Sequence, residues 1–211
     1  MNGMSTSQIS LIVGLGNPGR EYEGTRHNVG FQVTAAFMKS LPSGFNKKEK
    51  YNSVYWEGRF KGRNLLVQHP QTFMNLSGKA VAALAGAKGI APSEIIVAYD
   101  DMDLPLGKIR IRKSGSSAGH RGVESLIEYL GTSSFPRLRI GIGRPAAESI
   151  DHVLAEFGDD EKPVFDEILK MSVDALTLSL TRGVGHAMNT FNSISREPEK
   201  TTNPVKKPEP C

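Results

Sequence analysis

The sequence predicts a single α/β domain, in which a mixed, twisted β-sheet is flanked by helices on both faces. Short apolar, partly β-branched runs over residues 9–15, 95–99 and 137–143 are typical of buried strands. Segments with helical spacing separate these runs, so strands and helices alternate along the chain. Neither an internal repeat nor a linker divides the 211 residues, a length that suits one domain.

The first half of the chain predicts three strands and two helices. Strand 9–15 is followed by a Gly-punctuated loop over 16–28 and a helix over 29–41. Residues 42–50 are predicted to be a solvated loop. Strands 54–60 and 64–68 are joined by a turn around Lys61 and Gly62. A loop over 70–78 then leads into a helix over 79–88, with Ser77 as its expected N-cap.

The second half begins with strand 95–99, which runs into an acidic loop over 100–105. A strand over 108–113, a loop over 115–122 and a helix over 123–130 follow. Strand 137–143 comes next, and amphipathic helices are predicted over 151–157 and 161–182. We expect residues 9–195 to form the domain, with 1–8 as a flexible extension and 196–211 as a disordered tail rich in Pro and Lys.

Composition excludes several classes of protein. Lys and Arg outnumber Asp and Glu by 26 to 22, which gives a net charge of +4. Apolar runs stay short of the ~20 residues that span a bilayer, and the first residues lack the pattern of a signal peptide, so we expect a cytoplasmic protein. The one cysteine, Cys211, rules out a disulfide scaffold and argues against thiol catalysis. A coiled-coil or edge-pairing signal is missing too, and a monomer is expected.

A glycine motif follows the first strand. Gly14, Gly16 and Gly19 have the spacing of a dinucleotide-binding fingerprint, but Pro18 lies inside it and no helical pattern opens after it. The motif therefore predicts a tight turn at the carboxyl end of a strand, and not a nucleotide cofactor. Asn17 and Tyr22 would be presented to a ligand there.

His27 lies in the same loop and is a candidate general base. A histidine at such a position is more often a surface residue or one with satisfied hydrogen bonds. The functional interpretation requires an acid that orients the imidazole, and Asp100 at the end of strand 95–99 is the candidate. The sequence leaves open whether these two side chains meet.

Two further segments allow functional and structural interpretations. Asp100, Asp101 and Asp103 could hold Mg²⁺, or they could be one structural, one solvated and one turn carboxylate; no further ligand cluster supports a metal. The run Phe73-Met74-Asn75 could be a simple helix entry. Its amide could equally donate to a substrate carbonyl or hold a water, as a hydrolase requires. A serine-hydrolase elbow is not present.

A stripe of basic residues, set by strand spacing, is the main indication of a binding partner. Lys108, Arg110 and Arg112 alternate with isoleucines, so a strand would place all three bases on one face. Arg137 and Arg139 repeat the pattern, and the intervening Gly/Ser loop could form an anion-binding nest. Such a surface suits nucleic-acid phosphates, although a merely solvated sheet face remains an alternative.

These segments together resemble bacterial-type peptidyl-tRNA hydrolases. The resemblance is carried by LIVGLGNPGREYEGTRHNVGF, QTFMNLSGKAV, IIVAYDDMDLPLGKIRIR and SAGHRG followed by RLRIGIGRP, in order, from about residue 9 to 194. It implies an α/β enzyme that cleaves the ester between a peptide and the 3′ end of tRNA, which recycles tRNA from aborted translation. It also implies no metal or cofactor.

The resemblance implies roles for four polar residues of the site. His27 is similar to the base that activates water, and Asp100 to the acid that supports it. Asn17 matches the residue that favours a blocked amino group over a free one. Asn75 matches a residue that binds substrate and positions the carbonyl or the water.

The resemblance also assigns contacts with tRNA. Tyr22 and Phe73 correspond to contacts around the acceptor end, and Met74 lines the cleft. Arg112 and Arg139 align with positions that hold tRNA phosphate, which are members of the basic stripe identified above.

One position departs from the family pattern. The usual GHNG loop here reads Gly119-His120-Arg121-Gly122. Arg121 cannot accept a hydrogen bond, but it could donate to a ribose, a phosphate or a developing oxyanion. The departure leaves open a non-catalytic RNA-binding relative of the same fold. The joint presence of His27, Asp100, Asn17 and Asn75 favours an enzyme.

Overall fold

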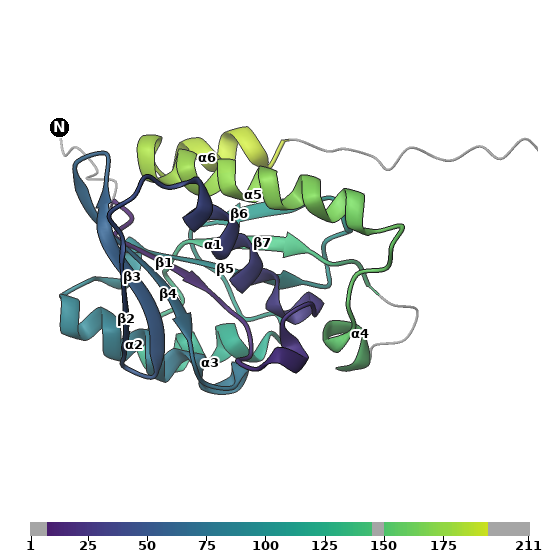
Figure 1. Cartoon of the computed structure of the whole chain (residues 1–211), viewed down its shortest axis with the longest axis horizontal. Coiled ribbons are helices and arrows are strands. Elements are labelled where there is room, and N and C mark those ends of the chain that lie inside the picture. The colour runs from purple at the N-terminus through teal and green to yellow at the C-terminus, as the bar shows by residue number, and fades with distance from the viewer. Residues whose placement is uncertain (1–7, 145–149, 194–211) are drawn as a thin grey trace, which may run out of the picture.

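The structure, a computed structural model, describes residues 8–144 and 150–193. The predicted extension over 1–8, apart from residue 8 itself, and the predicted tail over 196–211 lie outside the described residues. A seven-stranded sheet with the order β2-β3-β4-β1-β5-β7-β6 forms the centre of the described fold, with helices on both sides (Figure 1). None of the described helices is long and apolar enough to cross a membrane.

The sheet is mixed, as the sequence predicts. Four neighbouring strands at its centre run parallel: β4 (Arg63–Pro70), β1 (Leu11–Gly14), β5 (Ile95–Asp101) and β7 (Arg137–Gly141). Antiparallel strands complete both sides: β2 (Asn46–Lys50) and β3 (Ser53–Phe60) beyond β4, and β6 (Ile109–Arg112) beyond β7.

Each face of the sheet has its own apolar core. Helices α1 (Val29–Ser40), α5 (Lys162–Arg182) and α6 (Val184–Phe191) cover one face, and α2 (Ser77–Lys88) and α3 (Arg121–Leu130) cover the other (Figure 1). The short α4 (Ile150–Leu154) lies beyond one end of the sheet. Four 3₁₀ turns join these elements: η1 (Arg20–Tyr22), η2 (Arg26–Asn28), η3 (Met74–Leu76) and η4 (Pro92–Glu94). The predicted helical layers on both faces are confirmed.

The predicted solvated loop over 42–50 is wrong in its second half, which forms strand β2. All five residues of β2 are exposed, so the segment has no apolar alternation that could reveal a strand. A two-residue turn creates it: Tyr51 and Asn52 both have positive φ, and Lys50 pairs with Ser53. Such a turn matches the right-handed twist of a hairpin. The predicted turn at Lys61 and Gly62 has the same form.

Helix ends account for the other differences. Ser77 does not cap α2, because η3 runs directly into the helix and the N-cap position falls on Leu76. The helix predicted over 151–157 ends at Leu154. The chain after 182 forms a further helix, α6, which is absent from the predicted elements; Gly183, with φ of 86°, separates it from α5.

The arrangement of β1 and α1 creates the site. The chain continues from β1 into α1 on one face of the sheet, whereas from the neighbouring β5 it leads through β6 to α3 on the other face, and ligands bind at such a switch point. Gly30 lets α1 approach closely, since a Cβ there would lie 2.3 Å from the carbonyl oxygen of Ala98. This approach places η2, directly before α1, over the carboxyl end of β5.

Candidate functional site

A cleft of about 700 Å³ opens at the carboxyl ends of the parallel strands. The loop after β1 supplies Asn17, the end of β5 supplies Asp100, and η2 supplies His27. Eight of the predicted site residues besides Asp100 line this cleft with it: Asn17, Tyr22, His27, Phe73, Met74, Asn75, Arg121 and Arg139. Residues far apart in sequence thus meet in one place.

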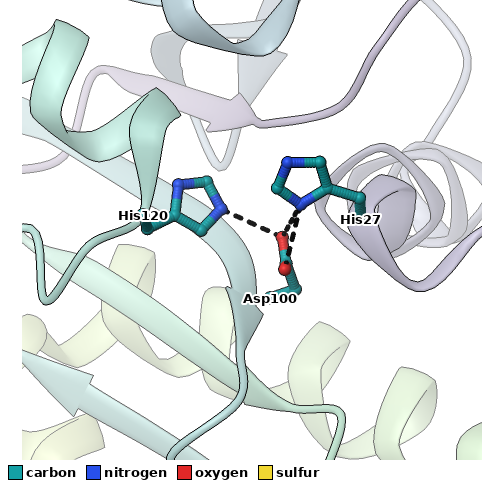
Figure 2. A group of neighbouring side chains, drawn as sticks. All are labelled: His27, Asp100 and His120. Carbon is teal, nitrogen blue, oxygen red and sulfur yellow. Dashed lines mark hydrogen bonds and ion pairs between the residues drawn. The ribbon is translucent and has the colours of Figure 1, made fainter. Parts of the chain in front are cut away.

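Two imidazoles share the Asp100 carboxylate (Figure 2). His27 Nδ1 lies 2.9 Å from Oδ1 and 3.0 Å from Oδ2 of Asp100. His120 Nε2 lies 3.0 Å from Oδ1 on the other side. The structure therefore brings together the predicted pair, and it adds His120 from the Gly/Ser loop as a third member.

The N-terminus of α3 fixes the tautomer of His120. As N-cap residue, His120 accepts bonds from the backbone N–H groups of Gly122 and Val123 at its Nδ1, at 3.1 and 3.3 Å. A nitrogen that accepts two N–H bonds has no proton of its own, so Nε2 carries the proton and donates it to Asp100.

The same logic assigns the tautomer of His27. Its Nδ1 faces both oxygens of a buried carboxylate and therefore donates. Nε2 consequently holds a lone pair, and within the described residues it has no hydrogen-bond partner. Figure 2 shows this second nitrogen directed away from Asp100. An unprotonated ring nitrogen at a cleft wall is the arrangement of a general base.

Burial and charge set the protonation of this group. Burial tends to lower the pKa of His27, but the Asp100 carboxylate raises it above the ordinary value of 6.5, and the charge of Arg121 lowers it in part. Burial also works to raise the pKa of Asp100. The two histidines nevertheless hold the pKa of that carboxyl well below its usual range. Asp100 is thus ionised, and it stabilises the charged form of His27.

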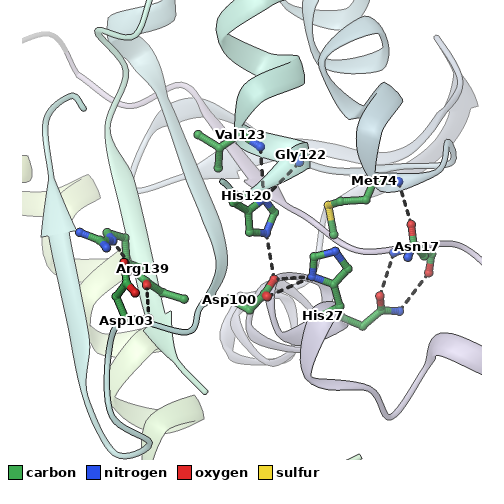
Figure 3. A network of polar contacts seen from close by, with 11 residues as sticks. Asn17, His27, Met74, Asp100, Asp103, His120, Gly122, Val123 and Arg139 are labelled. Carbon is green, nitrogen blue, oxygen red and sulfur yellow. Dashed lines mark hydrogen bonds and ion pairs between the residues drawn. The ribbon is translucent and has the colours of Figure 1, made fainter. Parts of the chain in front are cut away.

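The orientation of the Asn17 amide is fixed by the backbone around it (Figure 3). Its Oδ1 accepts from the Met74 N–H at 2.7 Å. The backbone N–H of Asn17 donates to Asn28 Oδ1 at 2.8 Å, and Asn28 Nδ2 donates to the backbone carbonyl of Asn17 at 3.0 Å. Because Oδ1 is occupied, the side chain has its Nδ2 donors to offer to the cleft.

His27, Asp100 and His120 also have residue types that can bind a metal, with ligand atoms all within 4.8 Å of one another. The donor set does not fit that use. A metal needs the lone pair of His120 Nε2, and the two N–H bonds to Nδ1 leave the ring proton on Nε2. The three side chains are arranged for hydrogen bonding.

The remaining carboxylates of the acidic loop have partners. Asp101 accepts from Arg139 and, at 2.9 Å, from the backbone N–H of Asp103. Asp103 pairs with Arg144. Figure 3 shows Arg139 and Asp103 apart from His27 and His120. The Mg²⁺ interpretation of these acids has no support, because two of the three already neutralise guanidinium groups.

The part of the predicted basic stripe on β6 keeps its predicted orientation and lies outside the cleft. Ile109 and Ile111 enter the core beneath α5 and α6, so Lys108, Arg110 and Arg112 share the opposite face, as predicted. Arg112 is exposed, and Lys108 and Arg110 are half-buried. None of the three lines the cleft.

The prediction that Arg137 binds phosphate is wrong. Only 2% of Arg137 is exposed. Its guanidinium donates to the carbonyls of Ser116 and Gly115 at 2.5 Å and of Ser133 at 3.1 Å, and it lies 4.4 Å from the centre of the Phe135 ring. The side chain is buried where β7 lies between β5 and β6, and it fastens the loop that leads to His120.

The comparisons with known proteins agree along nearly the whole chain. Residues 11–201 match the family model described as peptidyl-tRNA hydrolase. A peptidyl-tRNA hydrolase of Thermoanaerobacter sp. (strain X514) is 50% identical over 86% of this chain and 98% of its own. That of Aquifex aeolicus is 46% identical over 87% of this chain and 96% of its own.

A solved structure gives the same result in three dimensions. The crystal structure of peptidyl-tRNA hydrolase from Acinetobacter baumannii matches with a TM-score of 0.83 and 34% identity, over 90% of this chain and 98% of that one. The family model spans the strands and loops that form the cleft. The chain therefore belongs to the peptidyl-tRNA hydrolase family.

Proposed function

We propose that this chain hydrolyses the ester bond between a peptide and the 3′ end of tRNA, with His27 as the general base. Its family supports hydrolysis over the RNA-binding alternative. The observation that carries the assignment is the orientation of His27. Its Nδ1 is held by ionised Asp100, and its Nε2 lone pair lies at the wall of the cleft.

The reaction follows from this orientation. His27 Nε2 removes a proton from a water molecule as the water oxygen attacks the ester carbonyl. Asp100 stabilises the imidazolium that forms. As the tetrahedral intermediate collapses, His27 returns the proton to the ribose oxygen of the leaving tRNA. The products are a peptide carboxylate and a tRNA with a free terminal hydroxyl.

Two amides are placed to stabilise the intermediate and to select substrate. Asn75 is exposed at the cleft wall, where its Nδ2 can donate to the oxyanion; one such donor is typically worth ~3 kcal/mol. Asn17 offers Nδ2 donors because Met74 occupies its Oδ1. A donor pairs with the carbonyl of an acylated amino group and repels a free ammonium, which favours N-blocked substrates.

We assign the tRNA end of the substrate to the cleft mouth and the adjacent strand. Tyr22, Phe73 and Met74 would contact the terminal nucleotides, and Arg121 and Arg139 would bind phosphate or ribose near them. The face with Lys108, Arg110 and Arg112 would hold acceptor-stem phosphates, with an affinity that falls with salt. We also propose that the protein acts as a cytoplasmic monomer and needs no metal.

Single-turnover release from N-acetyl-aminoacyl-tRNA in EDTA tests this function. We expect wild type to release tRNA from the blocked substrate and not from unblocked aminoacyl-tRNA, and His27→Ala to release none. Arg121→Asn should weaken substrate binding and keep the hydrolytic step, since no hydrogen bond joins Arg121 to the His27–Asp100 pair; loss of its charge should raise the pKa of His27. Tight tRNA binding without release by wild type would mean an RNA-binding protein, and loss of release only in EDTA would mean a metal enzyme.

A further inference from the structure

The residue before His27 carries a buried charge that the proposed reaction does not use. The side chain of Arg26 is 9% exposed. Its Nη1 and Nη2 donate to the two carboxylate oxygens of Glu161, at 3.1 and 2.6 Å. The guanidinium also lies 4.6 Å from the centre of the Phe157 ring, which stacks on Phe165. Arg26 thus anchors η2 to the start of α5.

Backbone contacts join the same two segments. The Arg26 N–H donates to the Ala155 carbonyl at 2.9 Å, and Thr25 forms an isolated antiparallel bridge with Glu156. Residues 155–161 follow α4 directly, and α4 supplies Ile150, Val153 and Leu154 to the cleft wall. The turn that carries the base is therefore fastened on one side to Asp100 and on the other to the segment that continues the cleft wall.

This ion pair is a poor way to obtain stability, because the Arg26 guanidinium is buried while the Glu161 side chain stays 28% exposed. Well-packed apolar residues of similar volume often stabilise a protein as well or better, since the buried guanidinium must lose its water. The bidentate geometry instead fixes direction. Arg26 and His27 are adjacent, so a shift of the Arg26 anchor moves the imidazole. Displacement of about 1 Å at a reacting group can cost on the order of 10²-fold in rate.

We propose that Arg26 is a positioning residue, which through Glu161 and Phe157 holds η2 so that His27 meets Asp100 and faces the cleft. This inference rests on the proposed role of His27. Arg26 touches neither the reacting atoms nor the cleft, since it is not among the residues that line it. Its removal should slow the chemical step and leave substrate binding nearly unchanged.

Arg26→Met and the double variant Arg26→Met/Glu161→Met separate positioning from stability. The single variant leaves the Glu161 carboxylate without its partner, so its denaturation midpoint should fall. The double variant replaces the charges with apolar side chains, and its midpoint should return toward the wild-type value. We expect single-turnover rates 10- to 100-fold below wild type in both, with half-saturation within threefold. Arg26→Lys, which keeps one ion pair, should recover part of the rate.

The pKa of His27, measured by NMR titration, is a second readout that reports placement without any assay of hydrolysis. A looser contact with Asp100 should lower this pKa in both variants. The matched control is Asp159→Asn, which breaks the exposed pair with Lys162 at the start of the same helix and should change neither rate nor pKa. A double variant with wild-type rate and wild-type His27 pKa would overturn the proposal. If wild type itself proved inactive, the proposed function would fail, and the His27 pKa would still decide this inference.

Discussion

At the scale of single residues, one carboxylate controls the site. Asp100 is 3% exposed, yet it stays ionised because His27 and His120 both donate to it. His120 is kept in its donating tautomer by two backbone N–H groups of α3. The basicity of His27 thus depends on a chain of contacts that begins at a helix N-terminus. This chain predicts how the rate depends on pH.

The first prediction concerns Asp100→Asn. The pKa of His27 is raised above 6.5 by the carboxylate and would be lowered by burial alone. A neutral amide removes the raising contribution, so the acid limb of the pH–rate profile should move to lower pH. The plateau rate should fall by roughly 10²- to 10⁴-fold, because the imidazolium loses its partner and the tautomer is no longer fixed. Single-turnover rates between pH 4.5 and 8.5 measure both changes, and an acid limb that stays in place would refute this account.

At the scale of elements, strand β7 and the loop before α3 form one unit. Ala118 and Gly119 in this loop have positive φ angles, in the left-handed region of backbone conformation, and the loop supplies His120 to the site. Arg137 fastens it through the backbone carbonyls of Gly115 and Ser116. A basic residue next to a predicted nucleic-acid surface is therefore structural, whereas Arg112 on the neighbouring strand is exposed.

The second prediction separates these two arginines. Arg137→Met should lower the free energy of unfolding by about 2–4 kcal/mol, because three backbone carbonyls lose the donor that holds them and the loop loses its anchor. Arg112→Glu should leave stability unchanged, weaken tRNA binding and reduce the salt slope by about 1. Denaturation and tRNA titrations at several salt concentrations measure these effects, with Lys170→Glu on α5 as control. Equal tRNA affinity of Arg112→Glu and wild type would show that the basic stripe does not bind tRNA phosphates.

Element patterns explain what could be predicted from the sequence. Apolar runs and a Lys-Gly turn predict the central strands and one hairpin, since those elements are buried on a face or closed by a familiar turn. Strand β2 could not be predicted, because its five residues are exposed and Tyr51-Asn52 is an uncommon turn pair. His27 and Asp100 can be predicted as a candidate pair, because one lies in the loop after the first strand and the other lies at the end of the strand over 95–99. The role of His120 cannot be predicted in this way, because it depends on how α3 is capped.

At the scale of the whole molecule, a largely buried histidine outside the site links folding to pH. His69 on β4 lies 2.6 Å from the Thr34 hydroxyl of α1, stacks on Phe31 and meets the edge of Trp56. Burial lowers the pKa of His69 to about 4, against an ordinary value of 6.5. The imidazole joins a helix to two strands while neutral, and protonation opposes that packing.

The third prediction follows from this pKa. Between pH 6.5 and 4 the unfolded chain binds a proton at His69 that the folded chain does not, so stability is lost as the pH falls through this window. Relative to His69→Gln, wild type should lose about 2 kcal/mol of unfolding free energy between pH 7 and pH 5. Urea denaturation of both proteins isolates His69, because all other titrating groups are shared. Parallel curves for the two proteins would exclude this linkage.

Asp100 and the α3 N-terminus together hold His27 with Nδ1 protonated and with a lone pair on Nε2. Long-range ¹H–¹⁵N correlation NMR of the histidine rings, recorded at a pH where both are neutral, measures this directly. We expect the Nδ1–H tautomer for His27 and the Nε2–H tautomer for His120. An Nε2–H tautomer at His27 would contradict this expectation, because the nitrogen that must take the proton from water would already carry one.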